Sequence, residues 1–255
     1  MSFLPEGLTA EAAAIVVIAA FFTSAVTAAF GIGGGLLLLA VMGTTLPPAA
    51  VVPVHGVAQL GSNLSRFTLL RRDVVWPALG WFAAGCLLGS FIGASVYIGL
   101  PPWLLRLGVG IFVIATVWAP KPSNFNPGPR TFASVGAVGS FLSMFFGATG
   151  PIAAAAYGAT GWGRMNIVAT HAAAMTTQHG VKSLAFGIVG FDFFAWAALI
   201  AAIVGAGALG SIVGARILIG MPEALFQRGF RWALTITATY LIIRGAMDGL
   251  IVRTG

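Results

Sequence analysis

Apolar residues run along almost the whole chain, interrupted by short polar turns and by two glycine clusters. A helix rises about 1.5 Å per residue, so crossing about 30 Å of hydrocarbon takes roughly 20 residues. On this scale the first half predicts helices at 9–30, 48–70, 74–98 and 102–119, and the second half predicts helices at 131–146, 165–187, 193–218 and 224–251. The predicted fold is therefore an all-α polytopic membrane protein.

Each half also contains a glycine-rich break followed by a short apolar arm. The first break covers 31–35 with an arm to 43, and the second covers 147–151 with an arm to 160. Arms of about ten residues are too short to span a bilayer, so we expect half-helices or re-entrant arms. Backbone groups freed at a break must be buried in protein or line a polar cavity. Isolated glycines such as Gly85 and Gly110 indicate close helix packing instead.

The two halves repeat each other at a constant spacing. The segment 30–35 returns as 146–151, an offset of 116 residues. The same offset superposes His55 on His171, Asn63 on His179 and Arg66 on Lys182. A further pair of blocks, 89–94 and 210–215, matches at an offset of 121. Duplicated halves with glycine-broken apolar segments are typical of secondary transporters.

Basic residues predict how the halves are oriented. The turn at 71–73 contains two arginines, whereas its counterpart in the second half carries only Asp192. The uncharged turn at 43–48 corresponds to a turn that contains Arg164. Because short loops rich in Lys and Arg stay in the cytoplasm, we predict two inverted-topology repeats. Membrane repeat 1 is assigned to 1–120, a cytoplasmic linker to 121–130 and membrane repeat 2 to 131–255.

The composition agrees with this class. With 58% hydrophobic and 7% charged residues, the chain has too little polar surface for a water-soluble globule. The net charge of +7 lies in small basic clusters at helix ends, which indicates membrane topology and contact with lipid headgroups and argues against a nucleic-acid partner. The single cysteine, Cys86, excludes an intramolecular disulfide and argues against a thiolate metal site.

The helix after each break carries a stripe of polar residues. At 100 degrees per residue, one stripe contains His55, Gln59, Ser62 and Arg66 with Asn63 at its border, and the other contains His171, Gln178 and Lys182 with His179 at its border. Polar side chains are costly in lipid and normally face a bundle interior or an aqueous path. Two interpretations stay open: a substrate site, or hydrogen bonds between helices with Arg66 and Lys182 snorkelling to the headgroups.

The chemistry of these stripes predicts an anionic substrate. The N-terminus of each arm presents free N–H groups and the positive end of a helix dipole, which makes Gly33, Gly34, Thr149 and Gly150 candidate binding residues. All acidic residues lie at or near predicted helix ends: Glu6, Glu11, Asp73, Asp192, Glu223 and Asp248. No carboxylate is therefore available for an embedded cation site. The full set of candidate substrate-binding residues is Gly33, Gly34, His55, Gln59, Asn63, Arg66, Thr149, Gly150, His171, Gln178, His179 and Lys182.

Catalytic signatures are missing from the sequence. Three histidines without acidic or cysteine partners are a poor metal set, and the sequence contains no nucleophile-elbow or phosphate-loop pattern. We expect neither a cofactor nor an enzyme activity. Histidine, which titrates near neutrality, is the only side chain suited to carry a proton, so proton coupling through a histidine or sodium coupling through backbone carbonyls are the two expectations.

The chain resembles the sulfite exporter TauE/SafE family, also called the 4-toluene sulfonate uptake permease family. The first half carries the resemblance through the glycine-rich break at 30–35, the Leu46-Pro47-Pro48 turn and the segment 71–76, Arg-Arg-Asp-Val-Val-Trp. The second half carries it through Phe146-Gly147, Gly150-Pro151, a helix that begins near Met165-Asn166, and Asp192 before an aromatic run. Two positions depart from the family: Ala148-Thr149 interrupts the second glycine motif, and histidines 55 and 171 replace a usual Gly-Thr-Ser.

This resemblance implies a permease in a bacterial cytoplasmic (inner) membrane. Its substrate would be a sulfur-containing anion, and 4-toluene sulfonate is the specific organosulfonate we expect. A sulfite or sulfoacetate exporter and an anion channel are the alternatives. Aromatic residues near the two sites are candidates to receive an aryl ring or to pack the protein: Phe30, Phe67, Phe145, Phe146, Tyr157, Trp162 and Phe186.

Overall fold

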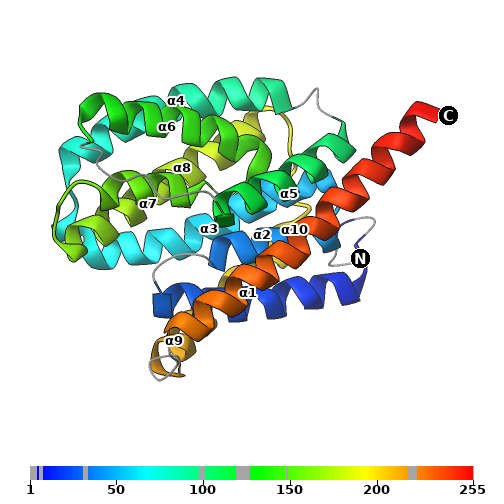
Figure 1. Cartoon of the computed structure of the whole chain (residues 1–255), viewed down its shortest axis with the longest axis horizontal. Coiled ribbons are helices and arrows are strands. Elements are labelled where there is room, and N and C mark those ends of the chain that lie inside the picture. Colours follow the sequence, from blue (N-terminus) through cyan, green and yellow to red (C-terminus); the bar gives the residue numbers. More distant parts are fainter. Residues whose placement is uncertain are drawn as a thin grey trace. The chain divides into compact units, whose positions relative to one another are not determined.

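The fold was analysed in a computed structural model, which describes residues 5, 8–30, 34–97, 101–118, 127–147, 149–217 and 223–254 (Figure 1). The helices of the first half are α1 (Ala10–Phe30), α2 (Gly34–Thr45), α3 (Pro48–Leu70), the 3-10 turn η1 (Arg71–Asp73), α4 (Trp76–Tyr97) and α5 (Pro102–Trp118). Those of the second half are α6 (Pro129–Phe146), α7 (Gly150–Gly158), α8 (Arg164–Ile188), α9 (Ala197–Ile217) and α10 (Glu223–Thr254). These described residues form no strand, so the all-helical prediction is confirmed.

The short arms predicted after the two breaks are α2 and α7. They contain 12 and 9 residues, and each precedes a helix of more than 20 residues, α3 or α8. The main departure from the sequence prediction is at the start of α9. The aromatic run after Asp192 forms turns in which the Asp192 carboxylate accepts hydrogen bonds from the backbone N–H groups of Phe194 (2.9 Å) and Ala195 (3.3 Å). The helix therefore begins at Ala197 instead of 193.

The described helices divide into two compact units. The first unit comprises Met1–His55, Leu100–Ala119 and Asp192–Gly255, and the second comprises Gly56–Gly99 and Pro120–Phe191. Each unit contains helices from both halves of the sequence. In the first unit α9 from the second half packs on α1, and in the second unit α4 from the first half packs on α6.

Within the first unit, small residues let helix backbones touch. A Cβ added at Gly210 of α9 would lie 2.0 Å from the Phe21 carbonyl oxygen of α1. On α5, a Cβ at Gly110 would lie 2.7 Å from the Ala238 carbonyl oxygen of α10. An ion pair between Arg106 and Asp248 also joins α5 to α10. The packing role predicted for Gly110 is confirmed.

The second unit also contains close contacts between glycines and helix backbones. Figure 1 shows α4 and α6 side by side. A Cβ at Gly85 would lie 2.0 Å from the Ala133 carbonyl oxygen, and a Cβ at Gly136 would lie 2.1 Å from the Phe82 carbonyl oxygen. Because lipid offers no hydrophobic drive for helix association, such close backbone contacts supply much of the packing energy. The packing role predicted for Gly85 is confirmed.

The turn between α3 and α4 is fixed onto α8 within the second unit. Asn166 donates its side-chain amide to the Asp73 carbonyl at 2.9 Å, and the Val75 N–H donates to the Thr170 hydroxyl at 2.9 Å. Two parts of the sequence that carry the family resemblance, the 71–76 segment and the start of α8, are therefore in direct contact.

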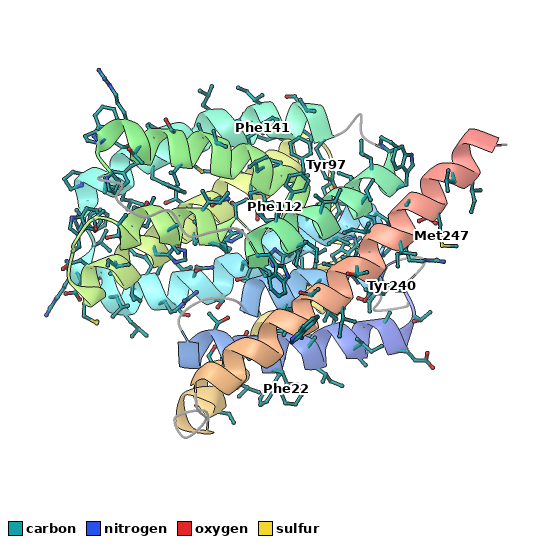
Figure 2. The ribbon with its side chains drawn as sticks, in the orientation of Figure 1. Phe22, Tyr97, Phe112, Phe141, Tyr240 and Met247 are labelled. Atoms are coloured by element: carbon teal, nitrogen blue, oxygen red, sulfur yellow. The ribbon has the colours of Figure 1, made fainter. Side chains whose placement is uncertain are left out.

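Large apolar side chains cover the outside of many helices. Phe22 on α1 and Tyr240 and Met247 on α10 point away from the ribbon in Figure 2, and each is about half exposed or more. Among the described residues, α1 and α4 contain windows long and apolar enough to cross a membrane, Ala10–Thr27 and Trp76–Tyr97. Exposed apolar surface of this extent fits a lipid environment.

The glycine contacts lead to a stability prediction. Gly85→Ala should lower the stability of the purified protein by about 1–3 kcal/mol, because its Cβ has no space against α6. Gly80→Ala on the same helix is the matched control, since nothing lies within 4 Å of its added Cβ, and it should keep or raise stability. Thermal unfolding in detergent measures both. Equal melting temperatures for the two variants would contradict the close contact of α4 with α6.

Candidate functional site

The second glycine break begins where α6 ends at Gly147. This residue has a φ of 75 degrees, in the left-handed region that favours glycine, and its N–H donates to the Ser143 carbonyl at 3.0 Å. The chain thereby leaves the helix abruptly. The last carbonyl groups of α6 then need partners from elsewhere in the protein.

Lys182 of α8 supplies one of these partners. Its ammonium donates to the Gly147 carbonyl at 2.8 Å and to the Ser143 hydroxyl at 3.1 Å. The side chain is fully buried, so of the two interpretations left open for Lys182, snorkelling to the headgroups does not hold. A cation at a helix C-terminus is favourable because the dipole places partial negative charge there. An ammonium has three donors, and these two acceptors use two of them.

A buried amide and a buried hydroxyl cross the same break. Thr149 donates to the Gly139 carbonyl of α6 at 2.9 Å, and Gln178 of α8 donates to the Thr149 hydroxyl at 2.6 Å. The Thr149 side chain is turned toward α6 and does not cap α7, whose N-terminus has no side-chain cap. The first turn of α7 therefore keeps the electropositive character that the sequence predicted for this position.

Equivalent histidines hold the first turns of the two arms. In the second unit, His171 Nε2 donates to the Gly150 carbonyl of α7 at 3.1 Å. In the first unit, His55 Nε2 donates to the Gly35 carbonyl of α2 at 2.9 Å. His55 is fully buried, and His171 is 9% exposed. Each histidine therefore positions the backbone of the arm that follows the glycine break.

The remaining stripe residues of α3 form a local cluster in the second unit. Asn63 is buried, donates its amide to the Gln59 carbonyl at 2.8 Å and accepts from the Arg66 guanidinium at 2.8 Å. His179 is also buried. In the part of the chain that the structure describes, no group of three or more His, Cys, Asp or Glu residues could hold a metal ion.

The first break is described only in part. Gly33 lies outside the described residues, as do its neighbours 31 and 32. Gly34 begins α2 in the first unit, and a Cβ there would lie 1.9 Å from the Thr23 carbonyl oxygen of α1. Only glycine allows this approach, so Gly34 has a packing role at the point where α2 leaves α1.

The structure thus joins five of the predicted residues around the second break: Thr149, Gly150, His171, Gln178 and Lys182. Ser143 completes this network, and the sequence analysis missed it. A signal was present, because the repeat offset of 116 superposes Ser143 on Thr27 and Ser140 on Ser24, so both halves carry hydroxyl groups one turn apart.

A comparison with known protein families identifies the family of this chain. The family model described as Sulfite exporter TauE/SafE matches residues 16–241, which include all of the residues discussed above around both breaks. The chain belongs to the sulfite exporter TauE/SafE family. Members of this family are membrane transporters, so the predicted family and the transporter class are confirmed. Searches of curated proteins and of solved structures found no match.

The histidine contacts predict a coupled effect on stability and binding. His171→Ala should leave the partly buried Gly150 carbonyl without its donor, which costs about 0.5–1.5 kcal/mol. With the arm displaced, binding of the sulfur-containing anion by the purified protein should weaken roughly ten- to a hundred-fold. His55→Ala should act in the same direction through Gly35.

Calorimetric titration and thermal unfolding measure these two effects. His171→Gln, which can still donate a hydrogen bond, serves as the matched control and should recover part of the affinity. Unchanged binding in both alanine variants would remove the histidines from the site.

Proposed function

We propose that this protein is a secondary transporter of sulfur oxyanions in a bacterial cytoplasmic membrane, with an organosulfonate such as 4-toluene sulfonate as the candidate substrate. The buried ammonium of Lys182 carries the proposal. It lies at the second break, between the C-terminus of α6 and the N-terminus of α7, and its two hydrogen bonds go to uncharged groups. A buried charge of this kind is costly unless it meets a charge of opposite sign.

The surroundings of Lys182 favour an anion over any other partner. No carboxylate among the described residues pairs with Lys182, and the ion pair of Arg106 with Asp248 lies in the first unit. The neighbouring groups at the break are donors or positive dipole ends: the Gln178 amide and the uncapped start of α7. A sulfonate or sulfite offers a negative charge and three acceptor oxygens to such a set.

The packing of the aromatic residues bears on the choice among sulfur oxyanions. Tyr157 stacks on Trp162 with ring centroids 6.1 Å apart, and Tyr97 packs edge-on against Phe186 at 4.9 Å. Rings that were candidates to receive an aryl group therefore have protein rings as neighbours. This observation supports a second candidate function, transport of the compact anion sulfite, alongside the organosulfonate.

The pairing of helices supports inverted repeats and a carrier mechanism. Helix α1 pairs with α9, and α6, which corresponds to α1 at the repeat offset, pairs with α4. In both pairs a helix of one half packs on a helix of the other half, as expected for two related halves arranged around a pseudo-two-fold axis. A carrier built this way closes over its substrate once per cycle, whereas an anion channel would conduct without closing.

Energy coupling forms part of the proposal. Accumulating an anion against an inside-negative potential costs about 2.3 kcal/mol per charge per 100 mV, so a cation must enter with it. We propose a proton carried by a histidine, or a sodium ion bound by backbone carbonyls at the breaks, as this cation.

Replacing the buried cation tests the proposed function. Lys182→Met keeps an unbranched side chain but removes the charge, and it should weaken binding of both sulfite and 4-toluene sulfonate by at least roughly thirty-fold, because truncating one member of a buried charge pair costs about 2–5 kcal/mol. Arg72→Gln, which removes an exposed charge from η1, is the control and should bind both anions like the wild type. Full affinity in a folded Lys182→Met protein would refute the anion site.

The inverted topology predicts the sidedness of two turns. Cysteines introduced at Arg71 and Asp192, in a Cys86→Ala background, should react with a membrane-impermeant maleimide from opposite sides of the membrane. Labelling in right-side-out and inverted vesicles compares the two. Reaction of both positions from the same side would leave a parallel duplication instead of an inverted one.

A further inference from the structure

A second group of polar side chains lies inside the core of the second unit, one layer away from the break. It consists of Cys86 and Ser90 on α4, Ser140 on α6 and Tyr157 on α7, and all four are fully buried. We name this group the hydroxyl cluster. None of these residues belongs to the polar stripes, and the proposed function uses only the ring of Tyr157.

The glycine contacts between α4 and α6 create the cluster. A Cβ at Gly136 would lie 3.1 Å from the Cys86 backbone nitrogen, so the two helices meet at the level of the thiol. The Cys86 sulfur lies 3.9 Å from the Ser90 hydroxyl, and the Ser140 hydroxyl is buried and has no hydrogen-bond partner among the described residues. The close approach of the two helices thus encloses a thiol and two hydroxyl groups in the packed interior of the unit.

Tyr157 provides the observation that points to a ligand. Its ring packs among Phe82 at 6.5 Å, Phe132 at 5.6 Å and Trp162 at 6.1 Å. Its hydroxyl is buried and has no hydrogen-bond partner among the described residues. Leaving a buried hydroxyl unpaired is unfavourable, and a tyrosine buried for packing alone would be served better by phenylalanine. Tyr157 and Cys86 belong to the same cluster of buried side chains.

The cluster also borders the cation of the second break. Ser143, which accepts from the Lys182 ammonium, lies one turn from Ser140 on α6. Every side chain of the hydroxyl cluster can donate a hydrogen bond, and no carboxylate is among them. Donors without acceptor carboxylates, next to a buried ammonium, match the requirements of an oxyanion.

We propose that the hydroxyl cluster is a binding site for the sulfur oxyanion head group, in which Tyr157 and Ser140 donate to its oxygens and Lys182 balances its charge. This inference rests on the proposed function and extends it, because it adds residues of α4, α6 and α7 to a site otherwise built at the break. The head group is shared by free sulfite and by the sulfonate end of a larger anion. The close packing of the rings around Tyr157 favours sulfite, whose size matches the head group alone.

Tyr157→Phe and Ser140→Ala test this site in the full-length purified protein. Each should weaken binding of sodium sulfite by about ten- to a hundred-fold, as expected for losing a hydrogen bond to a charged ligand. Tyr240→Phe and Ser95→Ala remove a hydroxyl from exposed positions on α10 and α4, and they should leave the affinity unchanged. Titration with sodium 4-toluene sulfonate runs in parallel.

Stability without ligand separates binding from a structural role. Because the Tyr157 hydroxyl has no partner among the described residues, Tyr157→Phe should keep or raise the melting temperature of the ligand-free protein while reducing the stabilisation that sulfite confers. Weaker binding of sulfite alone assigns the cluster to the free anion, and weaker binding of both anions assigns it to the shared head group. Wild-type affinity for both anions in both variants overturns the inference and leaves the proposed function standing. A wild-type protein that binds neither anion, at any concentration of sulfite or 4-toluene sulfonate that leaves it folded, overturns the proposed function and the inference together.

Discussion

The hydrogen bond from the Lys182 ammonium to the Gly147 carbonyl is the contact on which the site depends. A helix that stops inside a membrane exposes carbonyl groups that lipid cannot satisfy, so the protein must supply donors at that point. At the end of α6 the donor is a buried cation, held at 2.8 Å from the carbonyl. This hydrogen bond stabilises the break, and it also leaves a positive charge inside the protein. An anionic substrate is the natural partner for that charge.

Close packing of small residues makes this arrangement possible. The contacts of Gly85 and Gly136 draw α4 against α6, and α7 and α8 complete the same unit. Within it, side chains from three helices converge on the end of α6 without room for bulk lipid. The same density leaves donors facing one another in the core around Cys86, where no carboxylate competes for them. Small residues at the helix contacts allow the close packing of α4 on α6, and the lack of acidic side chains there underlies the anion selectivity that we propose.

Much of the fold could be predicted from the sequence. The thickness of the bilayer sets the length of a spanning helix, and the backbone freedom of glycine marks where helices break. The spans of α3 and α8 and the two short arms follow from apolar run length alone. Helix partners could not be predicted in this way. That α4 packs on α6, from the other half of the chain, depends on small residues such as Gly85 and Gly136, and glycine occurs throughout this sequence without indicating its partner.

The candidate site could likewise be predicted only in part from the sequence. Periodicity placed His171, Gln178 and Lys182 on one face of a helix, and the structure brings that face to the break. The periodicity could not show whether the Lys182 side chain turned outward to the headgroups or inward to Gly147, since its long flexible chain can place the ammonium among polar groups in either direction. Ser143 escaped notice because single hydroxyl groups on apolar helices usually bond to their own backbone, and Tyr157 was considered only for its ring. Only the three-dimensional contacts distinguish the Ser143 hydroxyl, which accepts from Lys182, and the Tyr157 hydroxyl, which has no partner among the described residues.

An experimental structure of the protein with selenite, a heavier analogue of sulfite, tests the central claim most directly. Anomalous scattering locates selenium without prior assumptions about the site. The account predicts one strong peak within the second unit, with an oxygen of the anion in hydrogen-bond reach of the Lys182 ammonium. A selenite bound elsewhere, with the Lys182 ammonium still bonded only to Ser143 and Gly147, would show that this buried cation serves the helix end alone and would contradict the account.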